Sequence, residues 1–331
     1  MWFEKLVGFR EIDPDQVRSN LLIEGKHLIS KVNGKRYQYG TLEIPRLREL
    51  REQSTRPEEF SGSIRVSEIV GDVLQLHRLH EKSVFQAASQ FNLLEMVNPQ
   101  VTPEEGVAIY ENDFTQGPAC AIACGAGTIY RNYFVEIDGG LGQSRERQID
   151  CLSDLGEYFN NKEQACWTMQ NGYALVNREG LTRINNTIKS LDPVAYEVLK
   201  GKLRIGLQLD TEVTIDQRKN TVTQAYCSAL PIGYSQVPAV QWEPFARLIL
   251  EATYEATFYA ALRHLKATGN DQLFLTLVGG GVFGNPLHWI LDAIEKTVLQ
   301  FKHVPLDVKI VSYGASNPGV KRFLAGLNME K

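Results

Sequence analysis

The sequence predicts an α/β protein whose mostly parallel sheet is covered by helices on both faces. Residues 273–278 form a fully apolar strand pattern that runs into three consecutive glycines. A helix pattern over 244–268 precedes this strand, and a second helix pattern (286–301) and a last strand (308–313) follow it. Strands that are apolar throughout and alternate with helices are typical of parallel sheets buried on both faces. We therefore expect a three-layer α/β/α fold with a mixed, mostly parallel central sheet.

The segments before residue 244 divide the chain into two parts. A hairpin is expected around Asn33-Gly34, because this turn-forming dipeptide separates two short strand patterns. The polar run 54–59 then indicates a linker. We expect an N-terminal extension over 1–62 that packs on a main domain over 63–331. In the main domain, strand patterns are found at 64–70, 83–88 and 222–230, and a helix pattern begins at Gly117-Pro118.

Composition and charge narrow the class of protein. The 331 residues carry 35 Lys and Arg against 39 Asp and Glu, a formal net charge of −4. A nucleic-acid partner is not expected, because affinity for phosphate backbones comes from clustered cations. A local basic groove is still compatible with this composition. No signal peptide or spanning segment is evident, so we predict a cytoplasmic protein without a membrane partner. The five cysteines lack metal-ligand spacing, and we predict no structural metal and no cofactor.

The stretch 279–285, Gly-Gly-Gly-Val-Phe-Gly-Asn, has the chemistry of a phosphate-binding turn. Glycine permits close approach of the backbone, and the amides that open the next helix point at anionic oxygen. Ligands of such sheets bind at the carboxyl ends of the strands. The spacing is neither GxGxxG with a downstream acid nor GxxxxGK[ST], which disfavours dinucleotide oxidoreductases and P-loop NTPases. The other interpretation is a glycine-rich turn that serves packing alone.

This stretch resembles the second phosphate loop of macrodomains through Gly281-Val282-Phe283-Gly284-Asn285-Pro286. Further segments match that family in order: 64–77 with its Gly-Asp turn, the strand 84–89, the helix start at 116–122 and the strand 226–231. The resemblance covers roughly 64–320 and implies an ADP-ribose site, with Asp72 on the adenine amine and Tyr313 beside the adenine. The ligand-binding residues that it implies are Asp72, Val73, Ser89, Gln116, Gly117, Ala119, Gly280, Gly281, Val282, Phe283, Gly284, Asn285 and Tyr313.

Two departures from the family affect the expected mechanism. The two asparagines of its third strand are Gln86 and Ser89 here, so the usual asparagine beside the distal ribose is replaced, and Asn92 is a substitute. The short glycine loop is expanded into an acidic insertion over 92–116. The insertion and the run 115–133 resemble the atypical macrodomains related to the bacterial effector MavL. That resemblance implies an ADP-ribosyl hydrolase acting on ADP-ribosylated ubiquitin.

Hydrolysis of a glycosidic bond passes through an oxocarbenium-like state and needs a carboxylate to activate water, and ideally an acid at the leaving group. The acidic insertion supplies these groups. Asp113 and Glu105 are the first candidates for catalysis, with Glu104 and Glu95 behind them, and Asn92 is the candidate in place of the missing asparagine. Two other interpretations are a solvated acidic loop and, for Glu95, a cap on a helical turn. Carboxylates here also suit an arginine leaving group, which they bind through paired hydrogen bonds.

Three functions therefore stay open at the level of sequence. The first is a hydrolase that removes ADP-ribose from a modified protein, with arginine-linked ADP-ribosyl-ubiquitin as one candidate substrate. The second is a non-catalytic ADP-ribose reader, which the missing asparagine makes credible. The third is a nucleotide-metabolite or methyl-donor enzyme on a related sheet. We expect an ADP-ribosylated protein as the partner under the first two.

Overall fold

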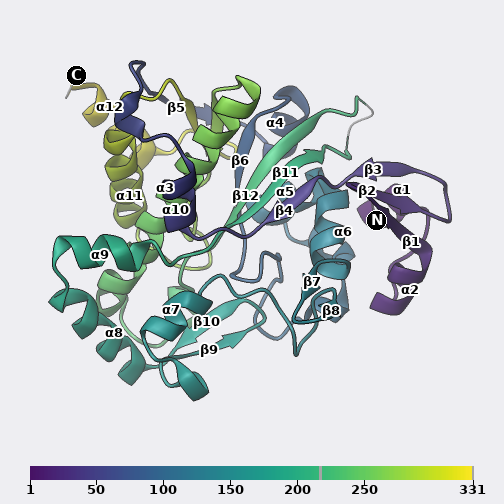
Figure 1. Ribbon diagram of the computed structural model, residues 1–331, viewed down its shortest axis with the longest axis horizontal. Helices are drawn as coiled ribbons and strands as arrows, with labels where there is room; N and C mark the ends of the chain where they lie inside the picture. Colours follow the sequence, from purple (N-terminus) through teal and green to yellow (C-terminus); the bar gives the residue numbers. More distant parts are fainter. Residues whose placement is uncertain (216–217, 330–331) are drawn as a thin grey trace.

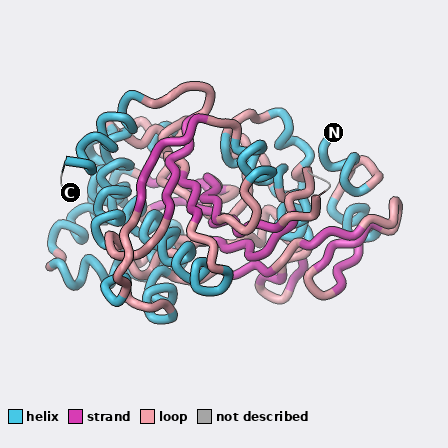
Figure 2. The backbone as a smooth tube through the Cα atoms, turned by 90° about the horizontal axis from the view of Figure 1, so that it is seen from above, coloured by secondary structure: helices cyan, strands magenta, loops and turns pink. Residues whose placement is uncertain are grey.

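A seven-stranded mixed sheet forms the centre of the molecule (Figure 1), seen in a computed structural model that describes residues 1–215 and 218–329. The strand order is β4-β11-β12-β6-β13-β14-β5, and the five strands from β12 to β5 run parallel. β11 is antiparallel to both of its neighbours. In the view from above, the strands form a twisted band with helices on both sides (Figure 2). The three-layer α/β/α fold with a mixed, mostly parallel sheet is confirmed.

The secondary structure follows the chain in this order. The strands are β1 (Leu21–Glu24), β2 (His27–Ser30), β3 (Arg36–Gln38), β4 (Thr41–Glu43), β5 (Arg65–Val70), β6 (Val84–Ala88), β7 (Glu136–Ile137), β8 (Gly140–Leu141), β9 (Trp167–Gln170), β10 (Tyr173–Val176), β11 (Gly206–Glu212), β12 (Thr221–Cys227), β13 (Gln272–Leu275) and β14 (Asp307–Ser312). The α-helices are α1 (Trp2–Val7), α2 (Pro14–Asn20), α3 (Leu47–Gln53), α4 (Val73–Leu79), α5 (Gln116–Ala123), α6 (Gly125–Tyr133), α7 (Ser153–Tyr158), α8 (Arg178–Ser190), α9 (Pro193–Lys200), α10 (Glu243–Thr268), α11 (Leu287–Gln300) and α12 (Pro318–Met329). The 3-10 helices are η1 (Pro57–Glu59), η2 (Pro103–Glu105), η3 (Ala108–Asn112), η4 (Lys162–Gln164), η5 (Ile232–Tyr234) and η6 (Ala239–Trp242).

Two successive side chains of the central strand β6 point to the two helical layers. Phe85 stacks on His77 of α4, with ring centroids 3.8 Å apart. The next residue, Gln86, donates to the hydroxyl of Thr257 on α10 over 2.9 Å. Since successive side chains of a strand point to opposite faces, α4 and α10 cover opposite sides of the sheet. α11 packs beside α10, and α5 packs beside α4 (Figure 1).

Most segments expected from the sequence are present. β2 and β3 form the hairpin around Asn33-Gly34, and β5, β6, α10, α11 and β14 lie at the expected places. β13 ends at Leu275, earlier than expected. Beyond it, two backbone amides bond to side chains and not to a neighbouring strand. The amide of Thr276 donates to Gln86 Oε1, and the amide of Val278 donates to the Tyr254 hydroxyl. No helix in the described ranges is long and apolar enough to cross a membrane.

The N-terminal segment contacts the main domain at several places. β1, β2 and β3 form a separate antiparallel sheet, whereas β4 pairs with β11 at the edge of the central sheet. The division at residue 62 stays a prediction, and the structure adds that residues before it contribute a strand to the main sheet. This segment therefore takes part in building the core.

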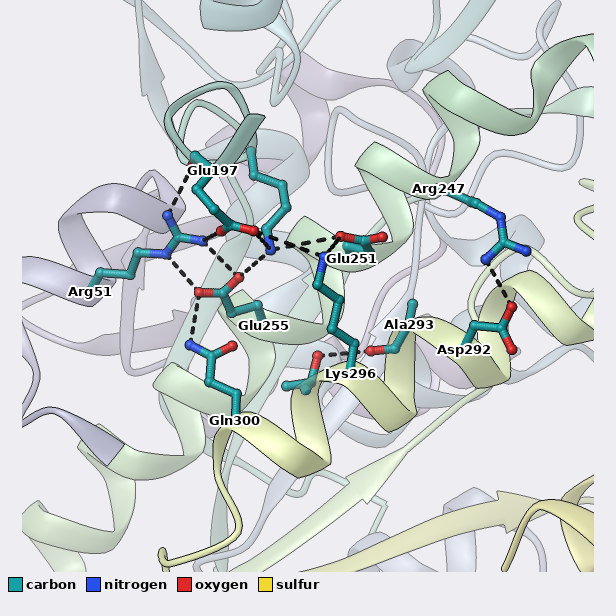
Figure 3. Close-up of polar contacts among 11 residues, drawn as sticks. Arg51, Glu197, Arg247, Glu251, Glu255, Asp292, Ala293, Lys296 and Gln300 are labelled. Carbon is teal, nitrogen blue, oxygen red and sulfur yellow. Dashed lines mark hydrogen bonds and ion pairs between the residues drawn. The ribbon is translucent and has the colours of Figure 1, made fainter. Parts of the chain in front are cut away.

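A buried charge network attaches α3 to the helices behind the sheet (Figure 3). Arg51 donates to both carboxylate oxygens of Glu255, over 2.6 and 2.8 Å, and to Glu197 over 2.6 Å. Lys200, which is also buried, lies 2.9 Å from the second oxygen of Glu255. Gln300 donates to Glu255 from α11. The carboxylate of Glu255 therefore joins α3, α9, α10 and α11.

Candidate functional site

The carboxyl ends of four parallel strands meet at one edge of the sheet. Asp72 follows β5, Tyr313 follows β14, the glycine turn follows β13, and Ser89 follows β6. Neighbouring strands lie about 4.8 Å apart, so these four ends span about 14 Å. Tyr313 is 81% exposed and Asp72 is half-buried. A long, narrow ligand can cross the four strand ends with one end near Asp72 and Tyr313.

A cavity of about 260 Å³ opens between the ends of β6 and β13. Seven of the residues expected at the site line it: Ser89, Asp113, Gln116, Gly117, Gly281, Val282 and Phe283. Glu95, a further catalytic candidate of the sequence, and Gly279 of the glycine turn also line it. Other residues complete the walls: Ala88, Gln90, Met96, Val97, Thr115, Pro118, Tyr173, Ala229, Tyr234, Thr276, Leu277 and Val278. The cavity therefore joins the glycine turn to the acidic insertion.

The glycine turn offers backbone donors to this cavity. The amides of Gly280, Gly284 and Asn285 are used within the turn itself. By contrast, the amides of Gly281, Val282 and Phe283 have no hydrogen-bond partner among the described residues. Val282 is 73% exposed. Three successive free amides at the end of a strand form the kind of concavity that binds phosphate oxygens.

Gly279 and Gly281 have different structural roles in the turn. Gly279 has φ +78°, and a Cβ there would collide with Ala229 and Asn285, so its role is conformational. A Cβ at Gly281 would meet nothing within 4 Å, and this residue faces the cavity. The glycine at 281 therefore leaves room for a ligand, whereas the glycine at 279 keeps the turn folded.

We expect Gly281→Leu to weaken ADP-ribose binding by roughly 10- to 100-fold, because the side chain displaces a phosphate from one or two charge-assisted hydrogen bonds. Thermal stability is unchanged, because the position is open. Gly326→Leu is the matched control, since a Cβ at Gly326 also meets nothing within 4 Å but lies on α12. Isothermal titration with ADP-ribose measures the effect. Equal affinity of wild type and Gly281→Leu would show that the turn does not hold the ligand.

Hydrogen bonds fix the loop that carries Glu95. The amide of Glu95 donates to the buried hydroxyl of Tyr110 over 3.0 Å, and the amide of Met96 donates to Gln90 Oε1 over 2.7 Å. Leu93 adopts φ +64°, a left-handed conformation that is costly for a bulky residue. Such conformations persist where the surroundings over-determine them, often at functional sites. The segment forms turns and coil, so Glu95 does not cap a helical turn.

The carboxyl group of Glu95 is buried against the first turn of α5. Glu95 is 5% exposed, and its Oε1 has no hydrogen-bond partner in the described chain. A Cβ at Gly117 would collide with its Oε2, so glycine at 117 allows the helix to approach this carboxyl. Burial raises the pKa of Glu95 well above its ordinary value of 4.5, and Asp113 raises it further, while Arg131 opposes the shift. Glu95 therefore holds its proton at higher pH than an ordinary carboxyl.

Asp113 lies beside Glu95 in the cavity wall, as a half-buried carboxylate. One oxygen accepts the amide of Thr115 over 2.9 Å, which fixes the side chain just before α5. Burial and Tyr234 raise the pKa of Tyr173, and Glu95 and Asp113 add to that shift. The two carboxyl groups therefore share one end of the cavity with Tyr173.

The other three residues expected to act in catalysis lie outside the cavity. Both polar atoms of the Asn92 side chain have protein partners, since its nitrogen donates to Gln148 and its oxygen accepts from the backbone amide of Leu94. Glu105 closes a capping box with the amide of Thr102 at η2. Glu104 accepts the amide of Arg145 over 2.7 Å. The structure thus brings Asp113 to the cavity and gives Asn92, Glu104 and Glu105 structural hydrogen bonds.

Some of the expected ligand contacts also serve the protein itself. Gln116 bonds the backbone at the end of β6, accepting from Ala88 and donating to Gln86. The Asn285 amide donates to Leu230 and Gly279, which closes the glycine turn. The Ser89 hydroxyl donates to backbone carbonyls. Expected contacts that do not line the cavity are Asp72, Val73, Ala119, Gly280, Gly284, Asn285 and Tyr313. Asp72 caps α4 by accepting the amide of Leu74.

Three aromatic rings cover the cavity between the glycine turn and β10. The ring centroids of Tyr173 and Tyr234 lie 5.2 Å apart, and Phe283 lies 5.4 Å from Tyr173 and 6.0 Å from Tyr234. Tyr173 is anchored by donating to the carbonyl of Met96 over 2.6 Å. No periodic pattern in the sequence indicates this group, because its members come from three distant segments.

The N-terminal segment supports the acidic insertion. Glu11 accepts the amides of Val107 and Ala108 over 3.1 and 2.6 Å, and the hydroxyl of Tyr133 over 2.7 Å. These amides immediately precede Tyr110, whose hydroxyl binds the Glu95 amide. Residues before position 62 therefore help to place the candidate catalytic loop.

Comparison with known proteins gives distant structural matches only. No family model matches the chain, and no curated protein matches it. A poly(ADP-ribose) glycohydrolase from Deinococcus radiodurans in complex with ADP-ribose has a TM-score of 0.45 and 12% identity, covering 86% of this chain and 95% of that chain. A poly(ADP-ribose) glycohydrolase from Thermomonospora curvata bound to the inhibitor ADP-HPD has a TM-score of 0.45 and 11% identity, covering 95% of both chains.

Proposed function

We propose that this chain is an ADP-ribosyl hydrolase that cleaves the glycosidic bond between the distal ribose of ADP-ribose and a modified protein side chain. The observation that carries the proposal is the buried carboxyl of Glu95, which has an unpartnered oxygen in a cavity next to free backbone amides. The amides of Gly281, Val282 and Phe283 bind the diphosphate. Asp72 and Tyr313 then lie toward the adenine end, and Glu95 lies at the distal ribose.

In the proposed reaction, Glu95 is the general acid. Its carboxyl gives a proton to the leaving atom as the bond to the anomeric carbon breaks, and the bonding electron pair stays on the leaving atom. Asp113 orients a water molecule, whose oxygen bonds to the anomeric carbon while its proton returns to a carboxylate. A raised pKa suits Glu95 to this role, because the group has to be protonated at the start.

An arginine-linked substrate is the finer proposal. A guanidinium leaving group pairs with carboxylates through charge-assisted hydrogen bonds and packs on aromatic faces. Asp113, Tyr173 and Tyr234 place both kinds of group in one cavity. Ubiquitin as the modified protein rests on the resemblance to the MavL-related macrodomains.

Release of ADP-ribose from proteins modified on arginine, serine or glutamate tests this function. We expect arginine-linked ADP-ribose to be released fastest. For every substrate that the protein cleaves, we expect release to depend on the residues that line the cavity. ADP-ribose binding without any release would favour the reader, and no binding of ADP-ribose would remove both functions. Equal release from serine and arginine would remove the arginine preference alone.

A further inference from the structure

Arg131 of α6 is a buried cation without a carboxylate partner. Its side chain is 0% exposed, and no ion pair within 4.0 Å involves it in the described chain. A buried guanidinium without a counter-charge loses the favourable solvation of its charge, and such groups persist where the surroundings or function require them. Packing alone therefore does not explain why a charged side chain is buried at position 131.

The contacts of Arg131 lead to the loop that carries Glu95. Its Nε donates to the carbonyl of Leu93 over 3.1 Å, which holds the residue in left-handed conformation two positions before Glu95. The other donors bind Gln208 over 3.3 Å and Thr128 over 3.1 Å. The guanidinium carbon lies 3.7 Å from the ring centroid of Tyr226. Arg131 is thus fixed from four sides, with its charge directed at the base of the loop.

We propose that Arg131 is a positioning residue for Glu95, which holds the loop by its bond to Leu93 and supplies the positive charge that stabilises the Glu95 carboxylate after proton transfer. This inference rests on the proposed function for its role in turnover. When Glu95 releases its proton, a negative charge forms on a side chain that is only 5% exposed. A fixed cation near that charge lowers the free energy of the step without having to reorganise.

Other groups that face Glu95 do not supply this charge. They are Asp113 before α5, Cys120 of α5, Tyr110 of η3, Tyr173 of β10 and Tyr226 of β12. Asp113 raises the pKa of Glu95 and so disfavours its negative charge, and the tyrosines and the cysteine are neutral because burial raises the pKa of each. Arg131 is the one cation among the groups that act on Glu95 in the described chain.

The test compares Arg131→Met with Thr128→Val. Thr128→Val removes a hydrogen-bond partner of Arg131 but leaves its charge. In Arg131→Met, we expect kcat to fall by on the order of tenfold, because Glu95 becomes a weaker acid. The descending limb of the pH–rate profile moves up by ~1–3 pH units, and KM changes little. In Thr128→Val the limb stays in place. An unmoved limb in Arg131→Met, or an equal shift in both variants, overturns the proposal.

Two further measurements cover other outcomes. If Arg131→Met does not fold, Arg131→Lys is the deciding variant, because lysine keeps the positive charge. We expect the descending limb of its pH–rate profile to stay at the wild-type pH, and a displacement of that limb by ~1 pH unit or more contradicts the proposal. The titration of Glu95, followed by carbon-13 NMR of labelled glutamate and assigned with Glu95→Gln, requires no turnover. If wild-type protein releases no ADP-ribose, the proposed function fails, whereas the effect of Arg131 on Glu95 is still measured by this titration.

Discussion

Glu95→Gln lowers turnover of an ADP-ribosylated substrate by roughly 10²- to 10⁴-fold, the range expected for loss of a general acid. Glutamine keeps the shape of the side chain but has no acidic proton to give to the leaving group. The affinity for ADP-ribose stays within a few-fold of wild type, because the diphosphate is held by the amides of the glycine turn. Single-turnover release and isothermal titration measure the two quantities separately.

Glu105→Gln is the control for this prediction, since Glu105 lies in the same insertion but closes a capping box outside the cavity. We expect little change in its turnover. Turnover in Glu95→Gln above about a tenth of wild type, or an equal loss in Glu105→Gln, would remove Glu95 as the acid. In wild type, the rate falls as the pH rises through the raised pKa of Glu95, because the acid form is lost.

Glu95→Gln also changes the stability of the folded protein, and the raised pKa of Glu95 sets how this change depends on pH. The pKa of Glu95 is higher in the folded protein than its ordinary value of 4.5, so the folded state binds the proton more strongly. The contribution of this group to stability is complete below pH 4.5 and is lost as the pH rises toward the folded-state pKa. We therefore expect the melting temperature of Glu95→Gln to gain on wild type as the pH is raised.

Arg51→Ala lowers the free energy of unfolding by about 3 kcal/mol, the lower end of the range for breaking a buried ion pair. The substitution removes two hydrogen bonds from the buried carboxylate of Glu255 and one from Glu197 (Figure 3). Lys200 stays 2.9 Å from Glu255, which keeps the loss near the lower end. Urea denaturation followed by circular dichroism measures the change.

Arg247→Ala is the matched control on α10, the helix of Glu255, because Arg247 pairs with the more exposed carboxylates of Glu243 and Asp292. Its expected cost is ~0.2–1 kcal/mol. Burial raises the pKa of Glu255, but the hydrogen bonds and charges of Arg51 and Lys200 outweigh this effect and hold that pKa below 4.5. This stabilisation is present above pH 4.5 and is lost as the pH falls through the lowered pKa, so the difference between wild type and Arg51→Ala shrinks in acid. Equal costs for both arginines would contradict the role of the buried network.

Local patterns in the sequence were sufficient to predict the fold. The apolar strand before Gly279, the long helix ending at Gly269 and the Asn33-Gly34 turn each depend on nearby residues, and all three are present. The contribution of β4 to the central sheet was not predicted. That strand pairs with β11, more than 160 residues later, and no local pattern encodes such a pairing.

The residues of the candidate cavity could be predicted only in part, for the same reason. Loop composition pointed to the glycine turn and to Asp113, and both line the cavity, whereas their chemical roles stay predictions. Glu95 was ranked behind Glu105, although its place in the apolar run Leu93-Leu94-Glu95-Met96 is a signal of a buried acid. Burial of a carboxyl depends on the helix packed against it, here through Gly117. A sequence does not show this packing directly.

A crystal structure of Glu95→Gln with ADP-ribose would show where the ligand lies. We expect diphosphate oxygens within hydrogen-bond distance of the amides of Gly281, Val282 and Phe283, and the anomeric carbon of the distal ribose next to the side chain at 95. Diphosphate bound elsewhere, or a distal ribose directed away from residue 95, would rule out both the phosphate-binding turn and Glu95 as the acid.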